Sequence, residues 1–302
     1  MELSWSTKLR ILGSVTVGVV LIGFIGWPLC APSEPRGAVL MVVGGGAATL
    51  FGVAFFCGLA AYFVSWPGGR EIGILAVPSG LAVWALRSGN MAGLLQLNPG
   101  SVSYRESIFE SIRWEPVFWL AVVGAGFAGV LLGQMIRQPK VEAEKEIEEG
   151  KTKAGLYSKV VMTVASLVIS VLVAQVLMGI LAQDVRIGDN RLGFVVGQPA
   201  IGQIVFAVLV SFGVSGFVVK RFLGASYIWP VVASALVTGV SVTVLMRKGL
   251  LEHVAGRYPA IFFANGILAI LPVQIVAFGV LGSVAGYWAA VRYDYWREHE
   301  LG

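Results

Sequence analysis

The chain has 302 residues, of which 57% are hydrophobic and 13% are charged, and its mean hydropathy is +0.81. Soluble globular domains carry about 25% charged residues, so the composition excludes an ordinary soluble domain and predicts an integral membrane protein surrounded by a lipid bilayer. The net charge is +5 and the pI is near 9.3. The basic residues are spread over loops and form no clustered face, which argues against a nucleic-acid partner.

Eight largely uncharged runs are long enough to cross the roughly 30 Å hydrocarbon core of a bilayer. We expect each run to be a helix, because every backbone amide in lipid must find its partner within its own segment. The predicted fold class is therefore all-α, a polytopic membrane protein with about eight spans near 11–29, 38–66, 72–95, 117–136, 160–182, 199–219, 226–246 and 260–291.

The first run, 11–29, has the basic start and short apolar core of a signal peptide. However, the sequence WPLC at 27–30 is neither a small-residue cleavage site nor a lipobox, so we expect the run to remain as a span. Cys30 and Cys57 are predicted not to pair. About 19 residues of helix at 1.5 Å each separate their depths, which is far beyond disulfide reach.

The third run contains Arg87, the one charge inside a predicted span. The stretch 72–86 alone is too short to cross comfortably, whereas an extension to residue 95 places Arg87 and Asn90 on one helix face. A buried arginine there would face a cavity or a partner. Alternatively, the helix ends at Leu86 and Arg87 reaches the outer headgroups.

Two further segments are predicted outside the ordinary spans. Ser103 and Glu106 have the spacing of a capping box and begin an amphipathic segment that ends at Trp114, which we interpret as a helix on the outer leaflet. The apolar segment 260–271 either continues into the last span, kinked at Pro272, or lies partly in the interface.

A charged linker, 137–159, divides the chain into two membrane regions, 1–136 and 160–302. The linker carries six basic residues and five glutamates. A short helix is predicted at 140–149, between a proline and a glycine. It either docks a partner or belongs to a solvated connector.

The two membrane regions resemble each other in sequence, which predicts a tandem repeat of four helices each. Pro116 and Pro272 open the fourth and eighth runs, and Ser79 and Ser234 stand in similar segments of the third and seventh runs, in the same order and at nearly constant offset. Because four is an even number, both regions enter the membrane in the same direction. We therefore expect a parallel pseudo-twofold axis along the membrane normal.

Rows of small residues at four-residue spacing predict close helix contacts, because they let helix backbones approach each other in lipid. The fourth and eighth runs carry equivalent rows, and we expect these two rows to pack against each other: Ala125, Gly129 and Gly133 in one run, and Gly282, Gly286 and Ala290 in the other.

The distribution of basic residues predicts the orientation. With both termini and the linker in the cytoplasm, seven of the eight lysines lie inside, and lysines and arginines together divide 13 inside to 9 outside. We expect a multi-pass protein of a bacterial cytoplasmic membrane.

The sequence offers little catalytic chemistry. His253 and His299 have no metal-ligand company, and no HExxH, GxGD or phosphate-binding glycine loop is present. Ser215 lies in a GxSG pattern like that of rhomboid-type serine proteases, but those enzymes need a histidine on another span, and no predicted span has one. We interpret Ser215 as a packing residue, and we expect no catalytic, cofactor-binding or metal site and no cofactor.

The remaining polar side chains in the spans form the candidate intramembrane site: Arg87, Asn90, Gln175, Gln203, Asn265 and Gln274. No carboxylate lies in a span centre, which disfavours an ion-driven carrier. Two functions remain. The first is a non-catalytic subunit or scaffold, bound to a membrane-protein partner or to further copies of itself. The second is a passive or partner-driven permease or channel for a small solute, with its path between the repeats. The scaffold is favoured because the polar groups are few and do not converge in sequence.

Overall fold

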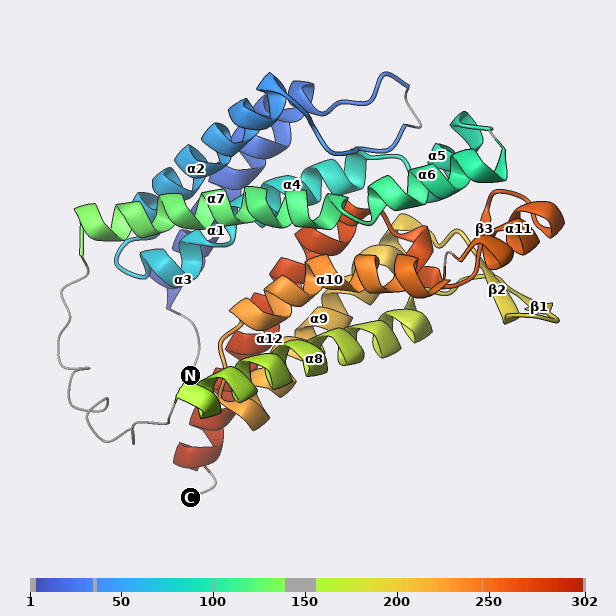
Figure 1. The fold of residues 1–302 in the computed structure, drawn as a ribbon. Coiled ribbons are helices and arrows are strands. Elements are labelled where there is room, and N and C mark those ends of the chain that lie inside the picture. The colour runs from blue at the N-terminus through green and yellow to red at the C-terminus, as the bar shows by residue number, and fades with distance from the viewer. Residues whose placement is uncertain (1–3, 35–36, 100, 139–155, 246, 301–302) are drawn as a thin grey trace.

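The computed structural model describes residues 4–34, 37–99, 101–138, 156–245 and 247–300. Eight helices in this part of the chain are long and apolar enough to cross a membrane, which confirms the all-α, polytopic membrane class. Within the described residues, sheet is limited to three short strands at one end of the helical bundle (Figure 1).

The first half of the chain supplies four spans together with four shorter helical segments. The elements in chain order are α1 (Trp5–Gly18) with its π-helical continuation η1 (Val19–Ile25), η2 (Trp27–Leu29), α2 (Gly45–Ser65), α3 (Gly69–Gly73), α4 (Ala76–Arg87), α5 (Met91–Leu97), α6 (Val102–Ile112) and α7 (Glu115–Ile136).

The second half supplies four spans, three strands and two short helical segments. Its elements are α8 (Leu156–Leu181), β1 (Arg186–Asp189), β2 (Gly193–Gly197), α9 (Ile201–Leu223), α10 (Ile228–Leu245), α11 (Lys248–Arg257), β3 (Phe262–Phe263), η4 (Gly266–Ala269) and α12 (Pro272–Glu300).

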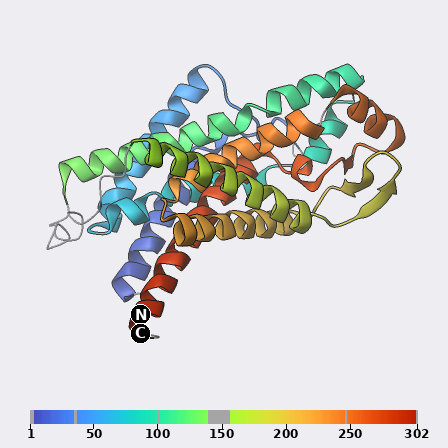
Figure 2. The same ribbon diagram turned by 60° about the horizontal axis from the view of Figure 1, so that its bottom comes forward.

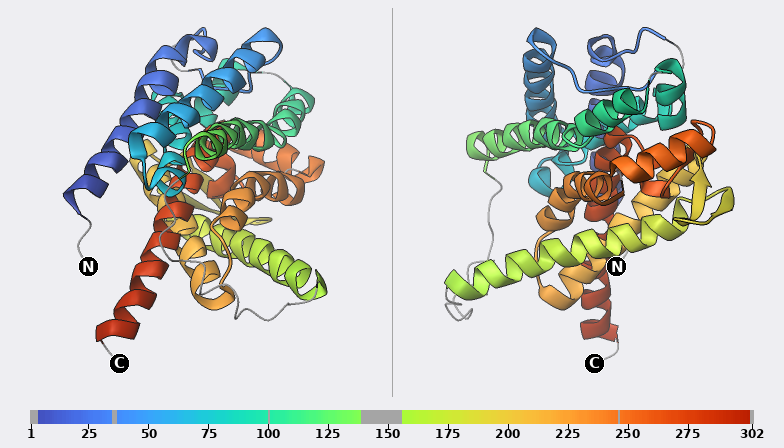
Figure 3. Two further views of the ribbon diagram at one scale, coloured as in Figure 1. Left: turned by 90° about the vertical axis from the view of Figure 1, so that its left-hand side faces the viewer. Right: turned by 45° about the vertical axis from the view of Figure 1, so that its right-hand side comes forward.

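The start of α1, the end of α7, the start of α8 and the end of α12 all lie on one side of the bundle, at the left in Figure 1. We call this side the linker end and the opposite side the loop end. The two described chain ends lie close together in Figure 2 and on the same side in both views of Figure 3. An even number of spans is required for this arrangement.

The small residues of α7 pack against α2, within the first half. A Cβ added at Gly129 would overlap the carbonyl oxygen of Phe55 in α2, and one at Gly133 would lie 2.6 Å from the ring of Tyr62 in the same helix. Ala125, on the same row, is half-buried. Close backbone approach is therefore possible because these positions lack larger side chains.

The small residues of α12 pack in the same way against α9, within the second half. A Cβ added at Gly282 would lie 2.5 Å from the carbonyl oxygen of Leu209, and one at Gly286 would overlap that of Gly213. Ala290 is fully buried on the same helix. The prediction that the rows of α7 and α12 pack against each other is therefore wrong: each row packs on the second span of its own half.

The halves meet through their third and fourth spans. α4 of the first half packs against α12 of the second, α10 of the second half packs against α7 of the first, and α7 also touches α12. One apolar core runs through both halves, and a smaller cluster joins Ile74 and Leu75 to Val284 of α12. In both cross-contacts the third span of one half packs against the fourth span of the other half.

The predicted extension of the third span to residue 95 is wrong, because α4 ends at Arg87. Ser88 adopts an extended conformation (φ −62°, ψ 150°), and its hydroxyl accepts a hydrogen bond of 2.8 Å from the N–H of Val39. Asn90 then begins a separate helix, since its side chain accepts from the N–H of Gly93 and caps α5. Arg87 and Asn90 consequently do not share a helix face.

The second span starts later than predicted, at Gly45 instead of residue 38. The preceding residues 37–43 form neither helix nor strand and are held by the bond from the Val39 N–H to Ser88 and by a 2.9 Å bond from the N–H of Gly89 to the carbonyl of Gly37. Gly44, with φ of +67°, supplies the left-handed conformation that turns this segment into α2.

The last span also starts later than predicted, at Pro272. Segment 260–271 forms β3, η4 and connecting turns, and residues 266–271 are buried, so the segment does not continue the helix of the last span. β1 and β2 form an antiparallel hairpin, and β3 pairs with β2 through Val196 and Gly197. These strands were not expected from the sequence.

The segment before the fourth span is helical, but its cap and its direction differ from the prediction. Ser101, not Ser103, caps α6 by accepting from the N–H of Tyr104. α6 continues the course of α7 beyond a bend (Figure 1, Figure 2) instead of lying across the end of the bundle. Arg113 and Trp114 keep right-handed helical dihedrals at the bend, which explains why the two helices stay nearly in line.

The predicted linker helix, 140–149, lies outside the described residues, as does most of the charged linker 137–159.

Candidate functional site

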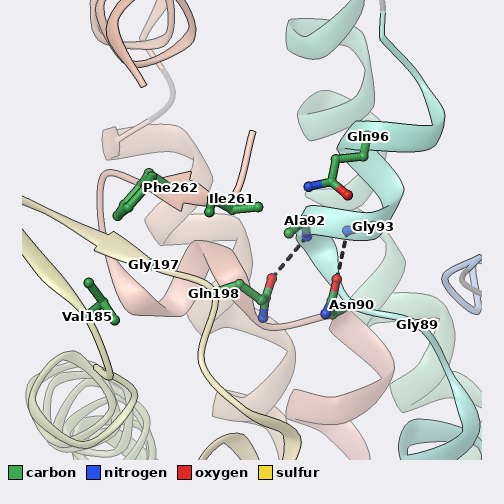
Figure 4. Close-up of a pocket in the computed structure, with 10 residues that line it drawn as sticks. All are labelled: Gly89, Asn90, Ala92, Gly93, Gln96, Val185, Gly197, Gln198, Ile261 and Phe262. Atoms are coloured by element: carbon green, nitrogen blue, oxygen red, sulfur yellow. Dashed lines mark hydrogen bonds between the residues drawn. The ribbon is translucent and has the colours of Figure 1, made fainter. Parts of the chain in front are cut away.

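A cavity lies at the loop end, where the two halves meet. It has a volume of about 620 Å³ and is bordered by the loop and helix around Asn90 in the first half and by Gln198 and Phe262 in the second. Figure 4 shows Gln198 and Asn90 on facing sides of this space. A second cavity of about 420 Å³ shares Gly89, Asn90 and Gln198 with the first and reaches Gln274.

Gln198 joins the two halves through both ends of its amide. Its Oε1 accepts a 3.0 Å hydrogen bond from the N–H of Ala92 in α5 (Figure 4). Its Nε2 donates to the carbonyl of Ala269 at 2.9 Å, and to that of Pro199 at 3.3 Å. The side chain therefore fixes α5 against the segment before α12.

Gln274 makes a second link between the halves, inside the bundle. The residue is 1% exposed, its Oε1 accepts from the N–H of Leu271 at 3.0 Å, and its Nε2 donates to the carbonyl of Ala85 at 3.3 Å. The carbonyl of Ala85 belongs to the last turn of α4, where main-chain acceptors lose their helical partners. The amide thus satisfies the ends of two helices from different halves.

The other predicted polar residues are dispersed, mostly at helix ends. Gln203 donates to the carbonyl of Leu181 at 3.0 Å and so completes the end of α8. Asn265 caps η4 by accepting from the N–H of Ile267 at 3.0 Å. Gln175 is half-buried in the middle of α8. Of the six predicted residues, Asn90 and Gln274 alone border the cavities.

Arg87 is exposed at the end of α4. Its guanidinium carbon lies 4.1 Å from the ring centroid of Trp27, within the range of a cation–π interaction. Arg87 therefore anchors the loop end of α4 on η2, and it does not face either cavity.

A polar cluster outside the spans joins the β1–β2 hairpin to α11. His253 Nε2 lies 2.7 Å from Asp189 Oδ2, and the hydroxyl of Tyr258 donates to the same oxygen at 2.8 Å. Burial opposes ionisation of Asp189, but hydrogen bonds from His253, the Leu192 N–H, Tyr258 and the Arg191 N–H outweigh it and lower the pKa of this carboxyl below its ordinary value of 3.8. The cluster fixes the hairpin to α11.

Sequence reasoning missed two residues at the loop end. Gln198 stands one position before the predicted span 199–219, and Glu115 stands two positions before the predicted span 117–136. Glu115 is 4% exposed, and its Oε2 has no hydrogen-bond partner among the described residues. The sequence feature that could have identified both residues is a polar side chain within two positions of the start of a predicted span.

The polar groups around the cavities are mainly side-chain amides and main-chain groups, and the amides of Gln198 and Gln274 are engaged in structural hydrogen bonds. Among the described residues, no three His, Cys, Asp or Glu side chains gather as a metal site. Ser215 is buried and donates to the carbonyl of Ser170 at 3.5 Å, and Cys30 and Cys57 are both free thiols.

Comparison with known proteins adds no relative: no protein-family model matches the chain, and no curated protein or solved structure is significantly similar to it.

Proposed function

We propose that the protein is a non-catalytic membrane scaffold, a subunit that associates with another membrane protein or with further copies of itself. The observation that carries the proposal is that hydrogen bonds and apolar packing join the two halves at several depths of the bundle. Gln198 and Gln274 direct their amides at main-chain groups of the opposite half, and Val284 packs on Ile74 and Leu75 farther along α12. Because these contacts would have to break if the halves moved relative to each other, the interface favours a rigid protein over one whose halves move during transport.

The proposal includes the tandem repeat with a parallel pseudo-twofold axis. It is supported by equivalent helix pairs: the second and fourth spans pack closely in each half, and the third span of each half reaches the fourth span of the other. Pro116 and Pro272 stand in the first turn of the two fourth spans, where proline is tolerated because the N–H has no helical partner.

The proposed orientation places the linker end in the cytoplasm. It is supported by the lysine distribution, because seven of eight lysines lie in segments on that side. The proposed location remains a bacterial cytoplasmic membrane.

The alternative, a passive or partner-driven permease, is favoured by one observation. The two cavities lie between the halves at the loop end and share Asn90 and Gln198, as the outer vestibule of a solute path would. Gln274 closes the inner side of the second cavity in this structure, so transport would require the halves to separate there.

Solute flux and partner retention distinguish the two functions. Proteoliposomes are tested by stopped-flow light scattering with glycerol, urea and a neutral pentitol, and native membranes are cross-linked before purification. A scaffold leaves flux at the rate of protein-free liposomes and brings down one partner, or its own copies, at constant stoichiometry. A faster flux that Ala200→Trp reduces, at the rim of the second cavity, would establish the permease instead.

A further inference from the structure

A groove on the lateral face of the bundle runs between α10 and the bend that joins α6 to α7. Its inner part has a volume of about 300 Å³ and is bordered by Trp114 and Val117 on one side and by Leu236, Gly239 and Val240 on the other. A second hollow of about 210 Å³ continues it toward the loop end and shares Arg113 and Thr243 with the inner part. Together they form one groove with two chemically different parts.

The inner part is apolar and open to the side. On α10 it follows positions 235/236, 239/240 and 243/244, which repeat every four residues and cover about 12 Å of helix at 1.5 Å per residue. Leu236, Val240 and Val244 are 38%, 41% and 52% exposed. Gly239 deepens the groove because it has no side chain, and a Cβ added there would have only the carbonyl oxygen of Arg113 within 4 Å, at 3.6 Å. A hydrocarbon chain fits this lining.

The outer part carries three charged side chains that form no ion pair within the described residues, although the Arg113 guanidinium lies 5.5 Å from the ring centroid of Trp114. It is bordered by Glu106, Glu110 and Arg113, and the two ion pairs found among the described residues, Arg221–Asp294 and His253–Asp189, involve none of them. The three side chains stand at intervals of four and three residues on one face of α6. Going from the start of α7 along α6 toward the loop end, Arg113 is reached first, then Glu110 and then Glu106.

This order matches the charges of one kind of lipid head group. α6 continues α7 outward (Figure 1), so Arg113 lies nearest the acyl chains, Glu110 about 4.5 Å farther out and Glu106 about one turn beyond that. A phosphate is the first charge beyond the glycerol of a phospholipid, and in an ethanolamine head group an ammonium follows it. Arginine is well suited to bind phosphate, and the carboxylates would accept hydrogen bonds from the ammonium.

We propose that this groove is a binding site for a phospholipid with an ethanolamine head group, with one acyl chain on Gly239 and Val240, the phosphate at Arg113 and the ammonium at Glu106 and Glu110. An anionic lipid without an amine would meet the two carboxylates unfavourably. The site is independent of the proposed scaffold function, because it uses the lateral face and none of the residues that join the halves at the cavities.

Native mass spectrometry tests the proposal on full-length protein taken from vesicles of equimolar phosphatidylethanolamine and phosphatidylglycerol with identical acyl chains. The wild-type protein is expected to retain one phosphatidylethanolamine with about tenfold preference, the ratio given by one charge-assisted hydrogen bond. Gly239→Leu fills the groove and should abolish the retained lipid. Gly52→Leu is the matched control, because a Cβ at Gly52 also meets nothing within 4 Å but lies on α2.

The double variant Glu106→Gln/Glu110→Gln changes no packing in the spans and keeps the test decisive if Gly239→Leu unfolds. It should retain one lipid but lose the preference for the amine. The proposal is overturned if the wild type retains the two lipids in their vesicle ratio or prefers phosphatidylglycerol, or if the double variant keeps the wild-type preference. A protein dimer that Gly239→Leu dissociates would assign the groove to a second copy instead.

Discussion

Gly282→Ala tests the close packing of α9 against α12. The added Cβ would lie 2.5 Å from the carbonyl oxygen of Leu209 and 3.2 Å from the main-chain nitrogen of Gly213, whereas favourable contacts between heavy atoms lie at about 3.5–4.0 Å. Both neighbours are main-chain atoms and cannot rotate away, so the helices must move apart by about 1 Å. We expect a loss of about 1–3 kcal/mol in unfolding free energy, as for overpacked cores.

Alanine also gains about 1 kcal/mol over glycine in helix propensity, which Gly52→Ala in α2 isolates because a Cβ there meets nothing within 4 Å. The difference between the two variants therefore measures the overpacking alone. Equilibrium unfolding in mixed micelles with increasing denaturing detergent gives both free energies. Equal stability of Gly282→Ala and Gly52→Ala would refute the close α9–α12 contact.

Three further predictions address the loops and the topology. Arg87→Lys should change the unfolding free energy by less than about 1 kcal/mol, because the exposed cation can still lie over an aromatic ring; a larger loss in the same micelle assay would show that the planar guanidinium is required. The lowered pKa of Asp189 means that its stabilising effect is complete above pH 3.8 and is lost as the pH falls below this value. The ratio of the pepsin cleavage rate of the wild type to that of Asp189→Asn, measured in parallel to cancel the pH dependence of pepsin itself, should therefore be higher at pH 3 than at pH 5; an unchanged ratio would contradict this role of Asp189. In a cysteine-free background, a membrane-impermeant maleimide added to intact cells should label Asn190→Cys and spare Glu146→Cys; the opposite pattern would reverse the orientation.

The number and approximate position of the spans follow from the sequence because a bilayer imposes a strict rule on both length and hydropathy. The same rule explains the errors at span ends. Residues 38–44 and 260–271 are as apolar as the spans, yet they do not form α-helices because their main-chain groups find partners in neighbouring loops, such as Val39 with the side chain of Ser88. Hydropathy does not distinguish an apolar segment buried in protein from one that crosses lipid.

The partners of the small-residue rows could not be derived from the sequence for a different reason. A row such as that of Gly129 in α7 shows that a helix packs closely, but its spacing contains no information about which helix is opposite. The candidate polar residues were partly recognised: Gln274 does link the halves, whereas Gln203 and Asn265 complete helix ends near their own positions. Gln198 was missed because its role depends on a loop contact with Ala92, 106 residues away.

Water access to the interface between the halves tests the proposed fixed body most directly. Val284 is 1% exposed, packs on Ile74 and Leu75, and lies about 18 Å along α12 from Pro272 at 1.5 Å per residue, near the middle of the span. In sealed vesicles, a water-soluble maleimide should leave Val284→Cys unmodified from both sides, while Asn190→Cys reacts from one side as a positive control. Labelling of Val284→Cys from either side would show a solute path between the halves and contradict the scaffold.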